Sequence, residues 1–220
     1  RMTLELLAHP FSSYSQKVLI ALYENATPFE FRMLDAEHPE NGAALMAHWS
    51  IGKFPLLLDA GRAVFESTII IEYLARHYPG TVALLPQDPE ACAEVRLLDR
   101  MFDTYVMAPM QAVVDNALCP VAQRHEPNVT RACAALDKAY DWFERRLAGR
   151  NWAAGDDFTL ADCAAAPALF YADWVHPIPA GNSVLRGYRA RLLERPSFAR
   201  CVDAARPYRP LFPLGAPDRD

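Results

Sequence analysis

Two short segments of the chain carry groups that could hold a small peptide. Phe54 precedes Pro55 at the start of the apolar run Leu56–Asp59, where a residue without an N–H suits only a strand's first position or a turn. If the Phe54–Pro55 bond is cis, the N–H and C=O of Phe54 are unpaired at the sheet edge and can pair with an extended peptide. Glu66 and Ser67 precede a helix whose first N–H groups can donate to a carboxylate, while Glu66 can bind an ammonium group. We therefore expect a peptide ligand with an amine-and-acid end, which suggests glutathione.

Length, charge and cysteine content favour a reduced, cytoplasmic protein. The chain has 220 residues, a net charge of −5 and dispersed basic residues, so we expect neither a nucleic-acid partner nor a membrane partner. Its apolar runs are shorter than the roughly 18 residues that span a membrane, and we identify no signal peptide. The five cysteines begin at Cys92, form no CxxC pair and, like the histidines, show no metal-binding spacing. We expect reduced thiols, no disulfide framework and no metal.

The elements that must position these groups alternate between strands and helices in residues 1–78. Runs of apolar or alternating residues predict four strands, and apolar residues at helical spacing predict three helices. The expected strands are Leu4–Ala8, Phe29–Leu34, Leu56–Asp59 and Ala63–Phe65. The expected helices are Ser15–Glu24, a short one within Pro39–Trp49, and Ile69–Tyr78. This β-α-β-α-β-β-α order is the thioredoxin-like arrangement, although the pattern alone leaves other α/β folds open.

After a proline-rich linker at residues 79–89, the pattern of residues 90–220 predicts an all-α domain. Apolar spacing predicts a helix over Glu90–Leu118 that is kinked at Pro109. Thr159 and Asp162 have the spacing of a capping box, which predicts a helix start with a structural role for both residues. The other expected helices are Val129–Leu147, Val184–Leu193 and Ser197–Ala205. The fold class is therefore α+β with two domains.

Four segments, taken in order, resemble one family along nearly the whole chain. They are FSSYSQKVLIAL, GKFPLLLD, VFESTIIIEYL and FTLADCAAAPALF. Together they resemble a cytosolic glutathione transferase of bacterial type and serine class, with a zeta- or tau-like N-terminal motif. The resemblance implies a thioredoxin-like glutathione-binding domain, an all-α domain that forms a pocket for an electrophile, glutathione as co-substrate, and a homodimer.

The resemblance also implies roles for individual residues. Pro55 matches the family's cis-proline, and Phe54 the residue whose backbone pairs with the cysteinyl part of glutathione. Glu66 and Ser67 match the pair that holds the γ-glutamyl end. Lys53 stands where several classes place a side chain that contacts the glycyl carboxylate.

Ser12 stands where the serine classes carry the hydroxyl that bonds the glutathione thiolate, and Ser13 is the alternative if the loop is shifted by one residue. Both serines could instead only cap the following helix. In the zeta-type pattern SSCSWRVRIAL, a cysteine and an arginine occupy the positions of Tyr14 and Lys17. Because these two residues depart from that pattern, the isomerase activity of the zeta enzymes is only a lesser alternative.

Several large side chains are candidates for the electrophile pocket, although an aromatic or methionine stripe at helical spacing more often belongs to a core. The candidates are Tyr14, Phe102, Tyr105, Met110 and Trp174. Two functions remain open. The first is a glutathione transferase that conjugates hydrophobic electrophiles or reduces peroxides. The second is a module of the same fold that binds glutathione or a partner without turnover.

Overall fold

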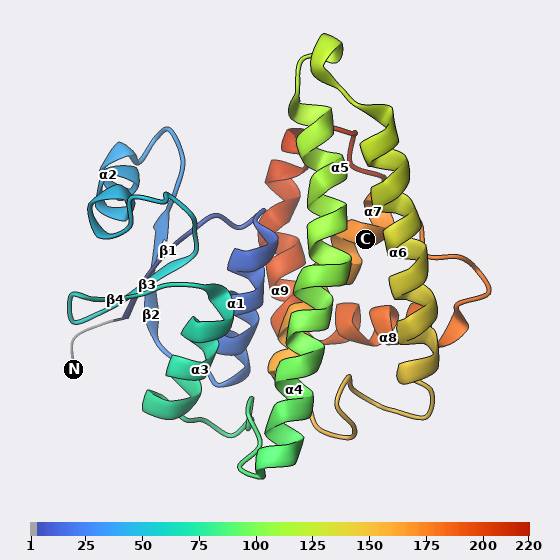
Figure 1. Ribbon diagram of the computed structural model, residues 1–220. Coiled ribbons are helices and arrows are strands. Elements are labelled where there is room, and N and C mark those ends of the chain that lie inside the picture. The colour runs from blue at the N-terminus through green and yellow to red at the C-terminus, as the bar shows by residue number, and fades with distance from the viewer. Residues whose placement is uncertain (1–3) are drawn as a thin grey trace.

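The N-terminal part of the molecule is a four-stranded sheet with helices on both faces. The computed structural model describes residues 4–220 and is shown in Figure 1. The strands are β1 (Leu4–Ala8), β2 (Phe29–Met33), β3 (Leu56–Asp59) and β4 (Arg62–Val64), in the order β2-β1-β3-β4. Strand β1 pairs in parallel with β2 and antiparallel with β3, and β3 pairs antiparallel with β4. The predicted fold class and the β-α-β-α-β-β-α order are confirmed.

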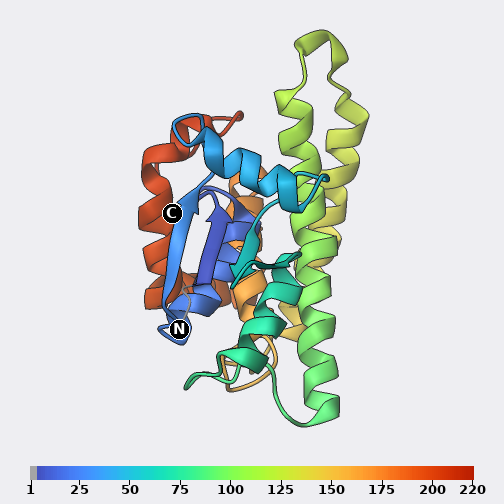
Figure 2. The ribbon, with the colours of Figure 1, turned by 90° about the vertical axis from the view of Figure 1, so that its left-hand side faces the viewer.

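Side chains alternate between the two faces of the sheet, so the apolar core of the N-terminal part has two layers, one on each face. Residues such as Leu6 and Leu57 point into the large core, which also contains buried residues of α1 (Ser13–Glu24) and α3 (Ser67–His77). Their neighbours Leu7, Leu56 and Leu58 point the other way and pack with Leu45 of α2 (Pro39–His48). Figure 2 shows α2 crossing the face of the sheet opposite to α1 and α3.

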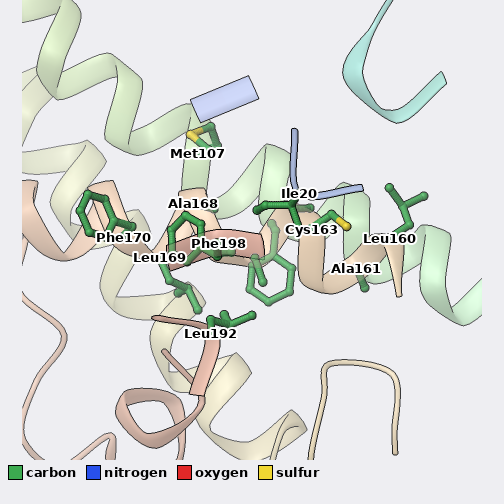
Figure 3. Packing of buried hydrophobic residues seen from close by; sticks show 14 of the residues in the cluster. Ile20, Met107, Leu160, Ala161, Cys163, Ala168, Leu169, Phe170, Leu192 and Phe198 are labelled. Atoms are coloured by element: carbon green, nitrogen blue, oxygen red, sulfur yellow. The ribbon is translucent and has the colours of Figure 1, made fainter. Parts of the chain in front are cut away.

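The C-terminal part is a bundle of helices packed around α7. Its helices are α4 (Pro89–Phe102), α5 (Ala108–Leu118), α6 (Glu126–Arg146), α7 (Leu160–Val175), α8 (Ser183–Glu194) and α9 (Pro196–Ala205). The residues from Leu160 to Trp174 are all buried, and many are alanines, which lets neighbouring helices approach closely. Figure 3 shows Cys163, Ala168 and Leu169 of α7 among side chains that include Ile20 of α1 and Phe198 of α9. The two parts therefore share one core.

The predicted helix over Glu90–Leu118 is present, with an irregularity that the pattern did not specify. Helices α4 and α5 are joined without a break by a π-helical turn, Asp103–Met107, directly before Pro109. Proline lacks an N–H and crowds the preceding turn, so the wider π-helical turn takes up the change that we expected as a kink. Within residues 4–220, no helix combines the length and apolar character that a membrane crossing needs.

The capping box predicted from the sequence starts α7. The Thr159 hydroxyl accepts a hydrogen bond from the Ala161 N–H at 3.3 Å, and the Asp162 carboxylate accepts one from the Thr159 N–H at 2.8 Å. The Asp162 carboxylate also accepts bonds from the Ala153 N–H at 2.8 Å and the Tyr188 hydroxyl at 2.6 Å. Because these bonds tie α7 to a loop and to α8, the structural role expected for both residues is confirmed.

Candidate functional site

A cavity of about 730 Å³ is lined by residues of the sheet part and of the helical part. Nine residues singled out in the sequence line it, although they come from four separate segments of the chain. They are Ser12, Ser13, Tyr14, Lys53, Phe54, Pro55, Glu66, Ser67 and Met110. The structure thus brings together the ligand-binding candidates of three of the four quoted sequence segments, and Met110 joins them from the helical part.

The Phe54–Pro55 segment presents backbone groups to this cavity. The peptide bond between these residues is cis, and Pro55 is buried while Phe54 is 38% exposed. The pairing of β1 with β3 ends at Leu7 and Leu56, so Phe54 lies just outside the ladder. Its N–H and C=O are therefore placed to pair with an extended ligand in the manner of an added strand.

The start of α3 combines a strained backbone with an available carboxylate. Glu66 precedes the first helical residue, Ser67, and has a φ of +65°, which is uncommon for a residue with a side chain. Within the described part of the chain, its carboxylate makes no capping bond to the helix. The exposed Glu66 carboxylate can accept hydrogen bonds from an ammonium group, and the first N–H groups of α3 can donate to a carboxylate.

Ser12 caps α1 and lines the cavity at the same time. Its hydroxyl oxygen accepts a hydrogen bond from the Ser15 N–H at 3.2 Å, and its own N–H donates to the carbonyl of His9 at 3.0 Å. Helix α1 consequently begins at Ser13, two residues earlier than the predicted start at Ser15. Since a hydroxyl has one donor and two acceptor sites, the cap leaves the Ser12 proton free to donate into the cavity.

A buried ionic network lies behind this helix start, and sequence reasoning did not find it. The Lys17 ammonium lies 2.6 Å from an oxygen of Asp99, 2.8 Å from Asp103 and 2.9 Å from the hydroxyl of Thr68. Burial raises the pKa of Asp103, and the Lys17 charge opposes this effect. The network joins α1, α3, α4 and the π-helical turn. The only local signal was a lysine among apolar residues of a helix, which indicates buried partners but not their identity.

The electrophile-pocket candidates divide into two groups. Tyr14 and Met110 line the cavity, and burial, followed by the nearby Asp103 charge, raises the pKa of Tyr14 to about 12. The Tyr14 hydroxyl therefore keeps its proton at neutral pH and can donate a hydrogen bond.

The prediction that Phe102, Tyr105 and Trp174 line the cavity was wrong. Phe102 is fully buried and stacks on Phe143 with ring centroids 4.1 Å apart, while Tyr105 is 54% exposed but is not part of the cavity lining. Trp174 packs in the core against Phe212, whose ring centroid lies 5.3 Å away.

Sequence reasoning also missed several residues that line the cavity. The helical part and the tail supply most of them. They include Trp49, Arg100, Asp103, Gln111, Val114, Asp115, Leu118, Leu211, Phe212 and Pro213. The four-residue spacing of Met110, Val114 and Leu118 was the one signal for the α5 members. Nothing local in the tail indicated that it contributes to the cavity.

The described residues offer no metal centre and no reactive cysteine in this cavity. Across residues 4–220, no group of three or more histidine, cysteine or acidic side chains could hold a metal ion. All five cysteines are free thiols, and burial raises the pKa of Cys163 and Cys201. The cavity can therefore bind and polarise a ligand through hydroxyls, backbone groups and fixed charges.

Comparisons with known proteins agree with this geometry. Residues 6–82 match the model of the glutathione S-transferase N-terminal domain, and residues 126–191 match that of the C-terminal domain. The chain is 34% identical over 175 residues to the glutathione S-transferase-like protein LUC7 of a Fusarium species, covering 78% of this chain and 76% of that protein. It is 28% identical to a stringent starvation protein A homolog of Coxiella burnetii, covering 90% of each.

A solved structure is similar over most of its length. The glutathione S-transferase of Methylobacterium radiotolerans, in complex with glutathione sulfonate, is 29% identical to this chain with a TM-score of 0.78. The match covers 91% of this chain and 95% of that one.

Proposed function

We propose, since this chain belongs to the glutathione transferase family, that it is an enzyme that activates the glutathione thiol for attack on a second, electrophilic substrate. The observation that carries the proposal is the position of Ser12, whose hydroxyl caps α1 and still has a proton to donate into the cavity. The complex of the Methylobacterium radiotolerans enzyme with glutathione sulfonate supports glutathione as the first substrate.

Glutathione binds along the sheet side of the cavity in this proposal. The backbone of Phe54 pairs with the cysteinyl part, and Pro55 fixes the direction of that backbone. Glu66 and Ser67 hold the ammonium and carboxylate of the γ-glutamyl end, and Lys53 contacts the glycyl carboxylate. Each of these residues lines the cavity, and each carries the group that its assigned contact requires.

Ser12 and the start of α1 supply the activation. A free thiol has a pKa near 8.5, and lowering it by about two units requires roughly 2.7 kcal/mol of preferential thiolate stabilisation. A charge-assisted hydrogen bond from Ser12 contributes about 1.5–3 kcal/mol, and the N-terminus of α1 about 0.3–1 kcal/mol. Together these contributions suffice without a general base. The thiolate then forms a bond to an electrophilic carbon, whose leaving group departs. Alternatively it attacks a peroxide oxygen, which breaks the O–O bond, releases the alcohol and leaves glutathione sulfenic acid; a second glutathione thiol converts this to glutathione disulfide with loss of water.

In the same proposal, residues 1–78 form the glutathione-binding domain, residues 79–89 a linker, and residues 90–220 the domain that supplies most of the electrophile pocket. Tyr14 and Met110 belong to that pocket because both line the cavity. From the family resemblance we also propose that the protein is cytoplasmic and forms a homodimer.

The test is a pH titration of thiolate absorbance for glutathione bound to the wild type and to Ser12→Ala. A saturable thiolate signal near neutral pH that is lost in Ser12→Ala supports the enzyme. Loss in the corresponding Ser13 variant instead would assign the contact to the neighbouring hydroxyl. Binding without ionisation would favour a non-catalytic module of the same fold. Absence of glutathione binding would refute both readings.

A further inference from the structure

With glutathione bound as proposed, the charges that line the cavity are all matched by opposite charges, with one exception. Arg100 lies 3.5 Å from Asp103, and both belong to the network in which Lys17 also pairs with Asp99, so this group of four charges sums to zero. In the proposed function, Lys53 and Glu66 are matched by the glycyl carboxylate and the γ-glutamyl ammonium of glutathione.

Asp115 is the exception. Among the described residues that line the cavity, it is the one charged group that neither an ion pair of the protein nor the proposed glutathione contacts would match. Its bonded partner is the neutral amide of Gln111, whose nitrogen donates to an Asp115 oxygen at 2.8 Å. This bond orients the carboxylate without neutralising it, so a ligand is free to supply the opposite charge.

The surroundings of Asp115 define the rest of the ligand. Asp115 is on α5, beside the apolar row formed by Met110, Val114 and Leu118 at four-residue spacing, and all four residues line the cavity. The tail contributes Leu211, Phe212 and Pro213 to the same cavity. A ligand that complements this part of the cavity wall has an apolar body, which contacts the apolar side chains, and a positively charged substituent, which pairs with Asp115.

We propose that Asp115, oriented by Gln111, selects second substrates that carry a positive charge beside an apolar electrophilic group. This inference rests on the proposed transferase function and names the substrate class that the same cavity prefers. A unit charge about 5–7 Å from the carboxylate in a partly solvated cavity gains roughly three- to tenfold in affinity. The preference decreases with added salt because Asp115 is exposed and ions screen it.

The test uses three electrophiles with one reactive chloronitrophenyl ring and different substituents: trimethylammoniomethyl, methyl and carboxylate. We would measure kcat/KM at saturating glutathione and divide each value by the uncatalysed rate with glutathione, which removes differences in intrinsic reactivity. The wild type should prefer the cation over the neutral compound and the neutral compound over the anion. Attraction to glutathione itself is the same in every variant, so the comparison between variants isolates Asp115.

Asp115→Asn keeps the acceptor for Gln111 and should lower the ratio of the cation to the neutral compound by roughly three- to tenfold, and Asp115→Lys should invert the preference. Asp156→Asn is the matched control, because it removes the same charge from an exposed loop residue that does not line the cavity, and its ratio should equal that of the wild type. Turnover of all three compounds with an unchanged ratio in both Asp115 variants would overturn this inference alone. Absence of glutathione-dependent turnover by the wild type would overturn the proposed function, and this inference with it.

Discussion

The hydroxyl oxygen of Ser12 lies 3.2 Å from the backbone nitrogen of Ser15 and accepts its N–H. The bond removes an unpaired donor from the first turn of α1 and holds the Ser12 side chain at the cavity wall. Capping uses a lone pair and thiolate binding would use the proton, so the two roles of Ser12 are separable by substitution.

Ser12→Asp should separate these roles. Aspartate is a good N-cap, so the free energy of unfolding in urea should stay close to the wild-type value, whereas Ser12→Ala should lose about 1 kcal/mol. Both variants lack the hydroxyl proton, and both should lose the thiolate signal of bound glutathione. Ser12→Thr, which retains the hydroxyl, serves as the control for both measurements. An Ser12→Asp variant that still ionises glutathione would contradict the assigned role.

Substitutions at Glu66 should show that the backbone conformation at this position lowers the stability of the fold. With a φ of +65°, the position suits glycine, so Glu66→Gly should be about 1 kcal/mol more stable to urea than Glu66→Ala. Alanine is ordinarily the more stable of the two, which makes the sign of the difference diagnostic. Both variants should bind glutathione at least tenfold more weakly in calorimetry because they lack the carboxylate. Equal or reversed stability would show that the backbone at residue 66 is unstrained.

Local signals explain what the sequence predicted correctly. The Phe54–Pro55 pair, the Glu66–Ser67 pair and the Thr159–Asp162 capping box each depend on residues that are adjacent or three apart, so their geometry follows from the local backbone. The order of strands and helices along residues 4–78 also followed, because the apolar and alternating runs were short and clearly bounded.

Long-range packing explains what the sequence did not predict. Helical spacing placed Phe102 and Met110 on apolar faces alike, yet Phe102 stacks on Phe143 in the core and Met110 lines the cavity. Which apolar face meets a neighbouring helix and which meets a cavity depends on helices that are distant in sequence. For the same reason, the sequence alone did not identify Asp99 and Asp103 as the partners of Lys17.

Lys17→Met should destabilise the fold by about 3–5 kcal/mol in urea, because it leaves two buried carboxylates without their cation. Burial raises the pKa of Asp103 in the folded state, so its protonation favours folding, and that contribution is lost as pH rises from about 4 through the folded pKa. Without the Lys17 charge the pKa of Asp103 rises further, so more of this carboxyl is protonated at pH 5 than at pH 8. The loss of stability caused by Lys17→Met should therefore be smaller at pH 5 than at pH 8.

The double variant Lys17→Met/Asp103→Asn provides the control for this prediction. It removes one of the two uncompensated charges and should recover part of the lost stability at pH 8. A defect that is independent of pH and is not relieved by Asp103→Asn would mean that Lys17 acts through packing of its alkyl chain.

The tail that contributes Leu211, Phe212 and Pro213 to the cavity should depend on Asp220 for its order. Arg206 lies 2.6 Å from one Asp220 oxygen, and Arg209 also pairs with this carboxylate. Asp220→Asn should speed amide hydrogen exchange over residues 206–216 at pH 7 by roughly three- to tenfold while leaving α7 unchanged. Asp218→Asn, which removes an equal charge from an exposed neighbour, is the control and should exchange as the wild type does.

The protection of the tail against hydrogen exchange should also depend on pH, through the ionisation of Asp220. Arg206, and then Arg209, lower the pKa of Asp220 in the folded state, so the ionic contribution is present above about pH 4 and is lost as pH falls through the folded pKa. The wild-type tail should therefore lose protection below about pH 4, after correction for intrinsic exchange, and approach the behaviour of Asp220→Asn. Equal protection of both proteins at pH 7 would mean that the buried Phe212 side chain, packed on Trp174, is sufficient to hold the tail.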